Sequence, residues 1–235
     1  MGIDPALCIR SMDQLAETAE RLGILPYFRN SIPGFSVEEH IAPEYWFGEA
    51  DGVWEWKGPL IRDYRFAYGR FFEKKTAWVT EEWFTDLANF RRCGYDMDAL
   101  YEDGFAPAAD RRLYELTAGA APVVSRRLKA LGDYGGKQES GFTSAMDRLQ
   151  AEGYVIISDF VYPLDRYGRP YGWGLAEYST PELFFGESFT RHVYERTPAE
   201  SYRRLLAHLK ELCPEAGERA LRRFLGKPAA PLNGA

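Results

Sequence analysis

The chain has 235 residues, enough for one large domain or two small ones, and 46% of them are hydrophobic, so a sizeable core can form. No apolar run approaches the ~20 residues that span a bilayer, and the N-terminus lacks the basic-then-apolar layout of a signal peptide. The three cysteines, Cys8, Cys93 and Cys213, have neither disulfide-framework nor metal-ligand spacing. We therefore expect a cytoplasmic protein that has no membrane segment, no metal site and no cofactor.

The charge is unevenly distributed along the chain. Residues 1–109 carry 11 Lys and Arg against 19 Asp and Glu, whereas residues 191–235 carry nine against five. Residues 110–180 hold nine of each sign. A net charge of -6 argues against a general binder of polyanions, and any contact with nucleic acid is expected in the C-terminal half.

The first part of the chain predicts helices. Residues 11–22 begin with Ser11, a good N-cap, and end before Gly23. Residues 36–47 have the spacing of a capping box, but Pro43 is expected to divide this helix into two short pieces.

Residues 54–79 are interpreted as strands. Tyr64, Phe66 and Tyr68 alternate with other residues at period two, and residues 73–75 interrupt the apolar pattern as a turn would. The aromatic stripe could be a platform for single-stranded nucleic acid, although a sheet packed on a helix explains it more simply.

A helix and a boundary follow this hairpin. Residues 80–92 predict a helix with Thr80 as its cap and two acids in the first turn. Residues 95–109 are acidic and irregular, and they are the candidate boundary between two domains.

Residues 110–180 predict a winged helix-turn-helix. Helices are expected over residues 110–117, capped by Asp110, over 126–131, capped by Ser125, and over 141–152. In the third helix Phe142, Met146 and Leu149 share one face, and Gly153 is its expected C-cap.

A hairpin completes this unit. A strand starts at Tyr154, a wing loop covers residues 163–170, and a second strand returns over 171–178. In DNA-binding members of this class, the third helix enters the major groove.

The C-terminal segment predicts a helical extension. Helices are expected over residues 191–212, with a restart at Pro198, and over 215–225, and the tail after Lys227 is expected to be disordered. The predicted fold class is therefore α+β, with domains at 1–109, 110–180 and 181–235. The helix, helix, hairpin order of the first domain leaves open a second, degenerate winged helix.

Candidate nucleic-acid contacts lie on the second helix, the turn after it, the third helix and the wing tip. They are Arg126, Arg127, Lys129, Lys137, Thr143, Ser144, Arg148, Arg166, Tyr167 and Arg169. These side chains suit phosphate contact and stacking. Asp147 on the third helix would be repelled by phosphate, and winged helices also serve as protein-interaction modules, so a purely structural role stays open.

Two strings of residues carry a family resemblance. Trp54-Glu55-Trp56-Lys57 and Tyr167-Gly168-Arg169-Pro170-Tyr171-Gly172-Trp173-Gly174 resemble short bacterial proteins described as AlkZ-related, over about residues 20–190. The larger AlkZ relatives are winged-helix DNA glycosylases that unhook crosslinks and remove alkylated bases. The resemblance therefore implies a relation to DNA repair.

The catalytic motif of those enzymes is missing. The glycosylases carry Gln-x-Gln or Gln-x-Asp, which positions the water, whereas Gln150-Ala151-Glu152 has only the spacing and is interpreted as a solvated helix end. Glu55 is the remaining weak candidate for a catalytic acid. In a strand, its side chain would point away from Trp54 and Trp56.

The predicted function is DNA binding by a protein that is related to DNA-repair glycosylases but lacks their motif. One alternative is a divergent glycosylase, which would place Glu55 at the base of an aromatic pocket facing the wing. The other is a protein-interaction module without nucleic-acid binding, with the acidic N-terminal half as the partner surface.

Overall fold

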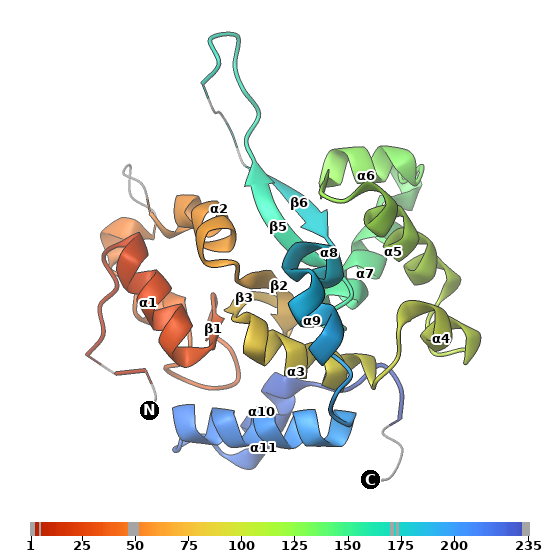
Figure 1. Ribbon diagram of the computed structural model, residues 1–235. Helices are drawn as coiled ribbons and strands as arrows, with labels where there is room; N and C mark the ends of the chain where they lie inside the picture. The colour runs from red at the N-terminus through yellow and green to blue at the C-terminus, as the bar shows by residue number, and fades with distance from the viewer. Residues whose placement is uncertain (1–2, 5, 47–51, 170–171, 173, 232–235) are drawn as a thin grey trace.

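A computed structural model describes residues 3–4, 6–46, 52–169, 172 and 174–231, and it shows a mixed α+β fold around one antiparallel sheet (Figure 1). The sheet has six strands in the order β1-β3-β2-β5-β6-β4 within this described part. The strands are β1 (Ile24–Pro26), β2 (Ala67–Phe72), β3 (Lys75–Val79), β4 (Val123–Val124), β5 (Ile156–Val161) and β6 (Leu175–Ser179). The predicted α+β class is confirmed.

The first helix, α1 (Met12–Leu22), begins and ends as predicted. The Ser11 hydroxyl accepts the backbone N–H of Gln14, and Gly23 ends the helix at a φ of 71°, in the left-handed region that suits glycine. The second predicted helix is two separate 3-10 turns, Val37–Glu39 and Pro43–Tyr45, so the expected division is confirmed. Its predicted end at Phe47 lies outside the described residues.

The strand predicted from Trp54 is wrong, because Val53–Tyr64 forms helix α2. The Glu55 carboxylate accepts the backbone N–H of Gly52 at 3.0 Å and stabilises the first turn. Trp56 and Leu60 are buried at helical spacing, so the aromatic content of the segment concealed a helical pattern.

The hairpin itself begins only at Ala67. Strands β2 and β3 meet at Glu73 and Lys74, which both have positive φ, and this confirms the predicted turn. The predicted helix at residues 80–92 is α3 (Glu81–Arg92). Residues 95–109, expected to be irregular, contain the short helix α4 (Met97–Glu102), which Asp96 caps.

Three helices follow in the predicted order: α5 (Ala108–Ala120), α6 (Ser125–Leu131) and α7 (Glu139–Ala151). Three of their predicted caps are wrong. Asp110 lies inside the first turn of α5, where it is buried, and Ser125 is already the first residue of α6. Glu152 is the C-cap of α7, and Gly153 follows it at a φ of 79°.

The hydrophobic face of α7 is as predicted. Phe142, Met146 and Leu149 are all buried. They anchor α7 against the rest of the core, and the opposite side of the helix stays available for other contacts.

Strands β5 and β6 form the long hairpin that extends away from the body between α2 and α6 (Figure 1). We call residues 163–169, the described part of the predicted wing loop, the wing. At its tip, the Asp165 carboxylate accepts the backbone N–H groups of Tyr167 and Arg169 at 2.7 and 2.9 Å. Pro170, Tyr171 and Trp173, where the returning strand was expected to begin, lie outside the described residues.

One pair of residues, Tyr68 and Ile157, joins the N-terminal hairpin to the wing hairpin. Because of this pairing, β2 and β5 are neighbours in a single sheet, although helices α3 to α7 lie between them in the sequence. The division into domains at residue 109 stays a prediction.

The C-terminal part contains α8 (Pro181–Phe185), α9 (Glu187–His192), α10 (Pro198–Leu212) and α11 (Glu218–Leu225). The restart at Pro198 is confirmed, with a capping box formed by Thr197 and Glu200. Disorder was predicted for the tail after Lys227; within its described part, residues 228–231, Ala229 donates its backbone N–H to the Arg91 carbonyl at 2.7 Å, and Ala230 is buried. Among the described helices, none is long and apolar enough to cross a membrane.

Candidate nucleic-acid interface

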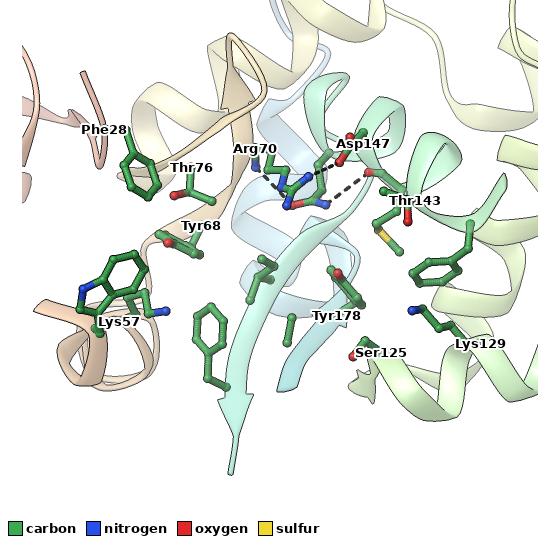
Figure 2. A pocket seen from close by; sticks show the side chains of 17 residues that line it. Phe28, Lys57, Tyr68, Arg70, Thr76, Ser125, Lys129, Thr143, Asp147 and Tyr178 are labelled. Carbon is green, nitrogen blue, oxygen red and sulfur yellow. Dashed lines mark hydrogen bonds and ion pairs between the residues drawn. The ribbon is translucent and has the colours of Figure 1, made fainter. Parts of the chain in front are cut away.

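A groove of about 400 Å³ opens over one face of the sheet, between α2 on one side and α6 and α7 on the other (Figure 2). We call it the central groove. Its floor consists of Tyr68, Ile157, Phe160, Ala176 and Tyr178, from strands β2, β5 and β6. The groove therefore lies where the two hairpins pair.

The aromatic floor follows from strand geometry. Alternate residues of a strand point to the same face, which places Tyr68 and Arg70 together on β2. Phe160 pairs with Ala176 across β5 and β6, and its ring lies 5.9 Å from the Tyr68 ring at a steep angle. Burial raises the pKa of Tyr68 well above its usual range, so this phenol stays neutral and can act only as a neutral hydrogen-bonding group.

Trp54 and Lys57 form the wall on the α2 side. They lie three residues apart, and a helix places such residues on one face. The Lys57 ammonium lies 4.9 Å from the centre of the Trp54 ring and 4.4 Å from that of Phe160. Burial lowers the pKa of Lys57, and the charge of Glu55 opposes that effect.

The opposite wall carries charges that are paired. Arg70 contacts Asp147 at 2.8 Å, and Lys129 contacts Glu139 at 2.5 Å. Asp147, which was expected to repel phosphate, is thus neutralised by an arginine of β2 in the same groove.

Gln150 lies at the end of the groove and is only 2% exposed, so its interpretation as a solvated helix end is wrong. Its side-chain oxygen accepts the backbone N–H of Arg70 at 3.2 Å, and its amide nitrogen donates to the Met146 carbonyl at 3.3 Å. Strand β2 covers the last turn of α7, although the two segments are far apart in the sequence.

The predicted contacts on the two helices and the turn between them reach different places. Lys129 and Thr143 line the central groove, while Arg126 and Arg127 are exposed on α6 and Ser144 is exposed on α7. The side chain of Lys137 lies outside the described part of the chain.

Arg148 is turned to a different partner. It donates two hydrogen bonds of 2.6 Å to the buried Asp110 carboxylate of α5, which raises the pKa of the guanidinium further. Its primary contact is therefore within the protein, and we assign it to the packing of α7 against α5.

The wing residues Arg166, Tyr167 and Arg169 are all exposed. The Arg166 guanidinium lies 4.7 Å from the centre of the Tyr167 ring. The described part of the chain offers neither arginine a carboxylate within ion-pair distance, so both can bind anions.

Glu55, the weak candidate for a catalytic acid, meets the condition set for it only in part. It is exposed, its carboxylate caps α2, and it lines a smaller cavity of about 290 Å³ with Trp54, Lys57, Tyr162, Gly172 and Gly174. That cavity faces the base of the wing and shares Trp54 and Lys57 with the central groove, but none of the floor residues of the groove line it. The strand geometry that separated Glu55 from the tryptophans is also wrong, since all three belong to a helix.

The sequence did not identify Lys57 as a site residue, and of the aromatic stripe considered as a platform for single-stranded nucleic acid only Tyr68, with the neighbouring Arg70, lines the groove. The spacing of Trp54 and Lys57 was visible, but it indicates a shared face only once the segment is known to be helical. The described residues contain no cluster of three or more His, Cys, Asp or Glu side chains that could hold a metal ion.

Comparison with protein families gives one match: a family model described as AlkZ related covers residues 9–226. Neither the curated proteins nor the solved structures include a match to this chain.

Proposed function

This chain belongs to the AlkZ-related family, and we propose that it binds DNA through a winged helix-turn-helix made of α5, α6, α7 and the β5–β6 hairpin. The family membership relates it to DNA-repair glycosylases. The observation that carries the proposal is the position of the central groove, which has cationic walls and lies at the base of an exposed, arginine-bearing wing.

The order of elements supports the winged-helix interpretation. The short strand β4 lies between α5 and α6 and pairs with β6, with Val123 opposite Tyr178. Helix α7 then leads directly into β5, so the hairpin is anchored to the helices by a third strand. A wing held in this way can reach a groove or the backbone beside the one that α7 contacts.

The distribution of cations supports an anionic partner. Lys57, Arg70 and Lys129 line the groove, and two further arginines, Arg166 and Arg169, lie at the wing tip. Because an aspartate and a glutamate of α7 neutralise two of the groove cations, we expect weak binding that depends strongly on salt.

The test is fluorescence anisotropy with labelled duplex and single-stranded DNA, at several salt concentrations. The double variant Arg166→Ala/Arg169→Ala should weaken binding to all sequences alike. It should also reduce the slope of log K against log salt by about two, because each arginine neutralises one phosphate.

The matched control is Arg191→Ala/Arg222→Ala. It removes two exposed arginines from α9 and α11, each of which is paired with a glutamate on its own helix. This control should leave affinity and slope unchanged. Absence of binding at low salt, or equally weakened binding in both double variants, would contradict the proposal and leave the protein-interaction module as the alternative.

A further inference from the structure

We propose that Lys57 is a nucleophilic amine, which forms an imine with the C1′ aldehyde of an abasic deoxyribose in DNA. This inference rests on the proposed DNA binding and deepens it, because it names a substrate class and a reaction for the central groove.

The first support is the place of Lys57 in the fold. It lines the central groove of about 400 Å³ and also the smaller cavity of about 290 Å³ that faces the base of the wing. Trp54, from the same helix face, lines both cavities with it. Lys57 is therefore accessible from both cavities.

The second support is the chemical environment. The Lys57 head group lies between the rings of Trp54 and Phe160, and within the described residues no carboxylate oxygen lies within 4 Å of it. A lysine acts as a nucleophile only when it is neutral, and a desolvated position among apolar groups favours the neutral form. Burial accordingly lowers the pKa of Lys57, the charge of Glu55 opposes that effect, and the two rings, which attract the protonated head group, hold it in position.

The other cations of the groove lack this environment. The Lys129 ammonium is bound by the Glu139 carboxylate, which favours its charged form, and the guanidinium of Arg70 does not deprotonate. Lys57 is therefore the groove cation suited to covalent chemistry, and the other two are suited to electrostatic contact.

The substrate class follows from the electrophile that an amine requires. Intact DNA offers no aldehyde, whereas a sugar that has lost its base opens to expose one at C1′. The reaction class that must supply this substrate is hydrolysis of a glycosidic bond, which releases a base and leaves the abasic sugar.

Imine formation balances in atoms and electrons. The Lys57 nitrogen lone pair attacks C1′ and forms a C–N bond, while the carbonyl oxygen takes a proton and becomes a hydroxyl. The nitrogen loses a proton to solvent, and the hydroxyl then takes a proton and leaves as water as the C=N bond forms. The nitrogen finally loses its second proton to solvent, so the net change joins one amine and one aldehyde and releases one water, with no oxidation.

The experiment is reductive trapping with sodium cyanoborohydride, using the full chain and a labelled duplex that contains one abasic site. The wild-type protein should give a covalent adduct that resists denaturation, and peptide mass spectrometry should locate it at Lys57. In Lys57→Arg the adduct per bound DNA should fall at least tenfold. Lys57→Met, which keeps an apolar stem, is a second variant to use if circular dichroism shows that the first is misfolded.

The matched control is Lys210→Arg, which alters an exposed lysine of α10 and should leave the adduct yield unchanged. An adduct located at another lysine, or equal yield in both lysine-to-arginine variants, would refute the assignment. Free 2-deoxyribose tests the other source of the aldehyde: an adduct with the free sugar but not with abasic DNA would also refute it.

Anisotropy on the same abasic duplex separates this inference from the proposed function. Binding without any adduct would refute the imine and leave DNA binding intact. Absence of both would refute the two proposals together.

Discussion

Replacing Arg148 by alanine should destabilise the protein more than it weakens DNA binding. The Asp110 carboxylate is 2% exposed, and both of its oxygens accept hydrogen bonds of 2.6 Å from Arg148. Removing one partner of a buried ion pair leaves an unpaired buried charge, which costs about 3–5 kcal/mol. Because the Arg148 side chain is 44% exposed, solvent screens part of this effect, and we expect the free energy of unfolding to fall by about 2–3 kcal/mol.

This destabilisation can be measured by urea and thermal unfolding followed by circular dichroism. For a chain of this size, 1 kcal/mol corresponds to about 2–4 °C in Tm, so the variant should melt about 4–12 °C lower. In an Asp110→Asn background, Arg148→Ala should cost much less, because the neutral amide needs no cation, and the double-mutant cycle isolates that coupling. A variant with unchanged Tm and clearly weaker DNA binding would refute this reasoning and make Arg148 a DNA contact.

Two further predictions concern buried charges. Burial, and next the charge of Asp110, raise the pKa of Glu152 to about 7. Because its folded pKa lies above its unfolded one, Glu152 stabilises the fold fully below about pH 4.5 and loses that contribution as the pH rises through 7. In urea titrations, the free energy of unfolding of the wild-type protein should therefore fall by about 3 kcal/mol between pH 5 and 8, and Glu152→Gln should abolish this decrease. An unchanged pH profile in the variant would contradict this prediction. Arg92 is 1% exposed and donates hydrogen bonds of 2.6 Å to Glu182 and to the Gly153 carbonyl, so Arg92→Met should lower the free energy of unfolding by about 3–5 kcal/mol. Arg92→Lys should recover only part of this stability, because lysine lacks the forked guanidinium that reaches both acceptors. Full recovery by lysine in thermal melts would argue against this reasoning.

The parts of the fold that were predictable are those with local causes. The capping box of α10 and the glycine that ends α1 depend on residues within one helical turn. The buried face of α7 follows from Phe142, Met146 and Leu149 at a helical period. Such signals are contained in the sequence of a single element, so they need no knowledge of its neighbours.

Two of the differences from the prediction have causes that act over a distance. Gln150 is buried because β2 packs over the end of α7, and nothing near Gln150 in the sequence indicates that contact. Residues 228–231 pack against α3, where the Arg91 carbonyl accepts the backbone N–H of Ala229. A polar helix end and a tail rich in Ala and Pro would be solvated in isolation, and only tertiary packing decides otherwise.

The sequence did not predict the central groove, because the groove depends both on a contact between distant segments and on an element that was assigned wrongly. Its floor depends on the pairing of Tyr68 with Ile157, which joins two hairpins that local patterns treat separately. Its α2 wall depends on a helix that was interpreted as a strand.

The string Trp54-Glu55-Trp56-Lys57 shows how much depends on that one assignment. As a helix, it directs Trp54 and Lys57 into the groove, uses Glu55 to cap its own first turn and buries Trp56 in the core. As a strand, the same string places both tryptophans on one face and Glu55 on the other, which makes Glu55 the conspicuous acid and Lys57 an ordinary surface charge. The roles of all four residues thus depend on whether the segment is assigned as a helix or as a strand. The candidate for chemistry accordingly moves from the carboxylate of Glu55, which its capping role occupies, to the amine of Lys57, which lies between two aromatic rings without a carboxylate partner among the described residues.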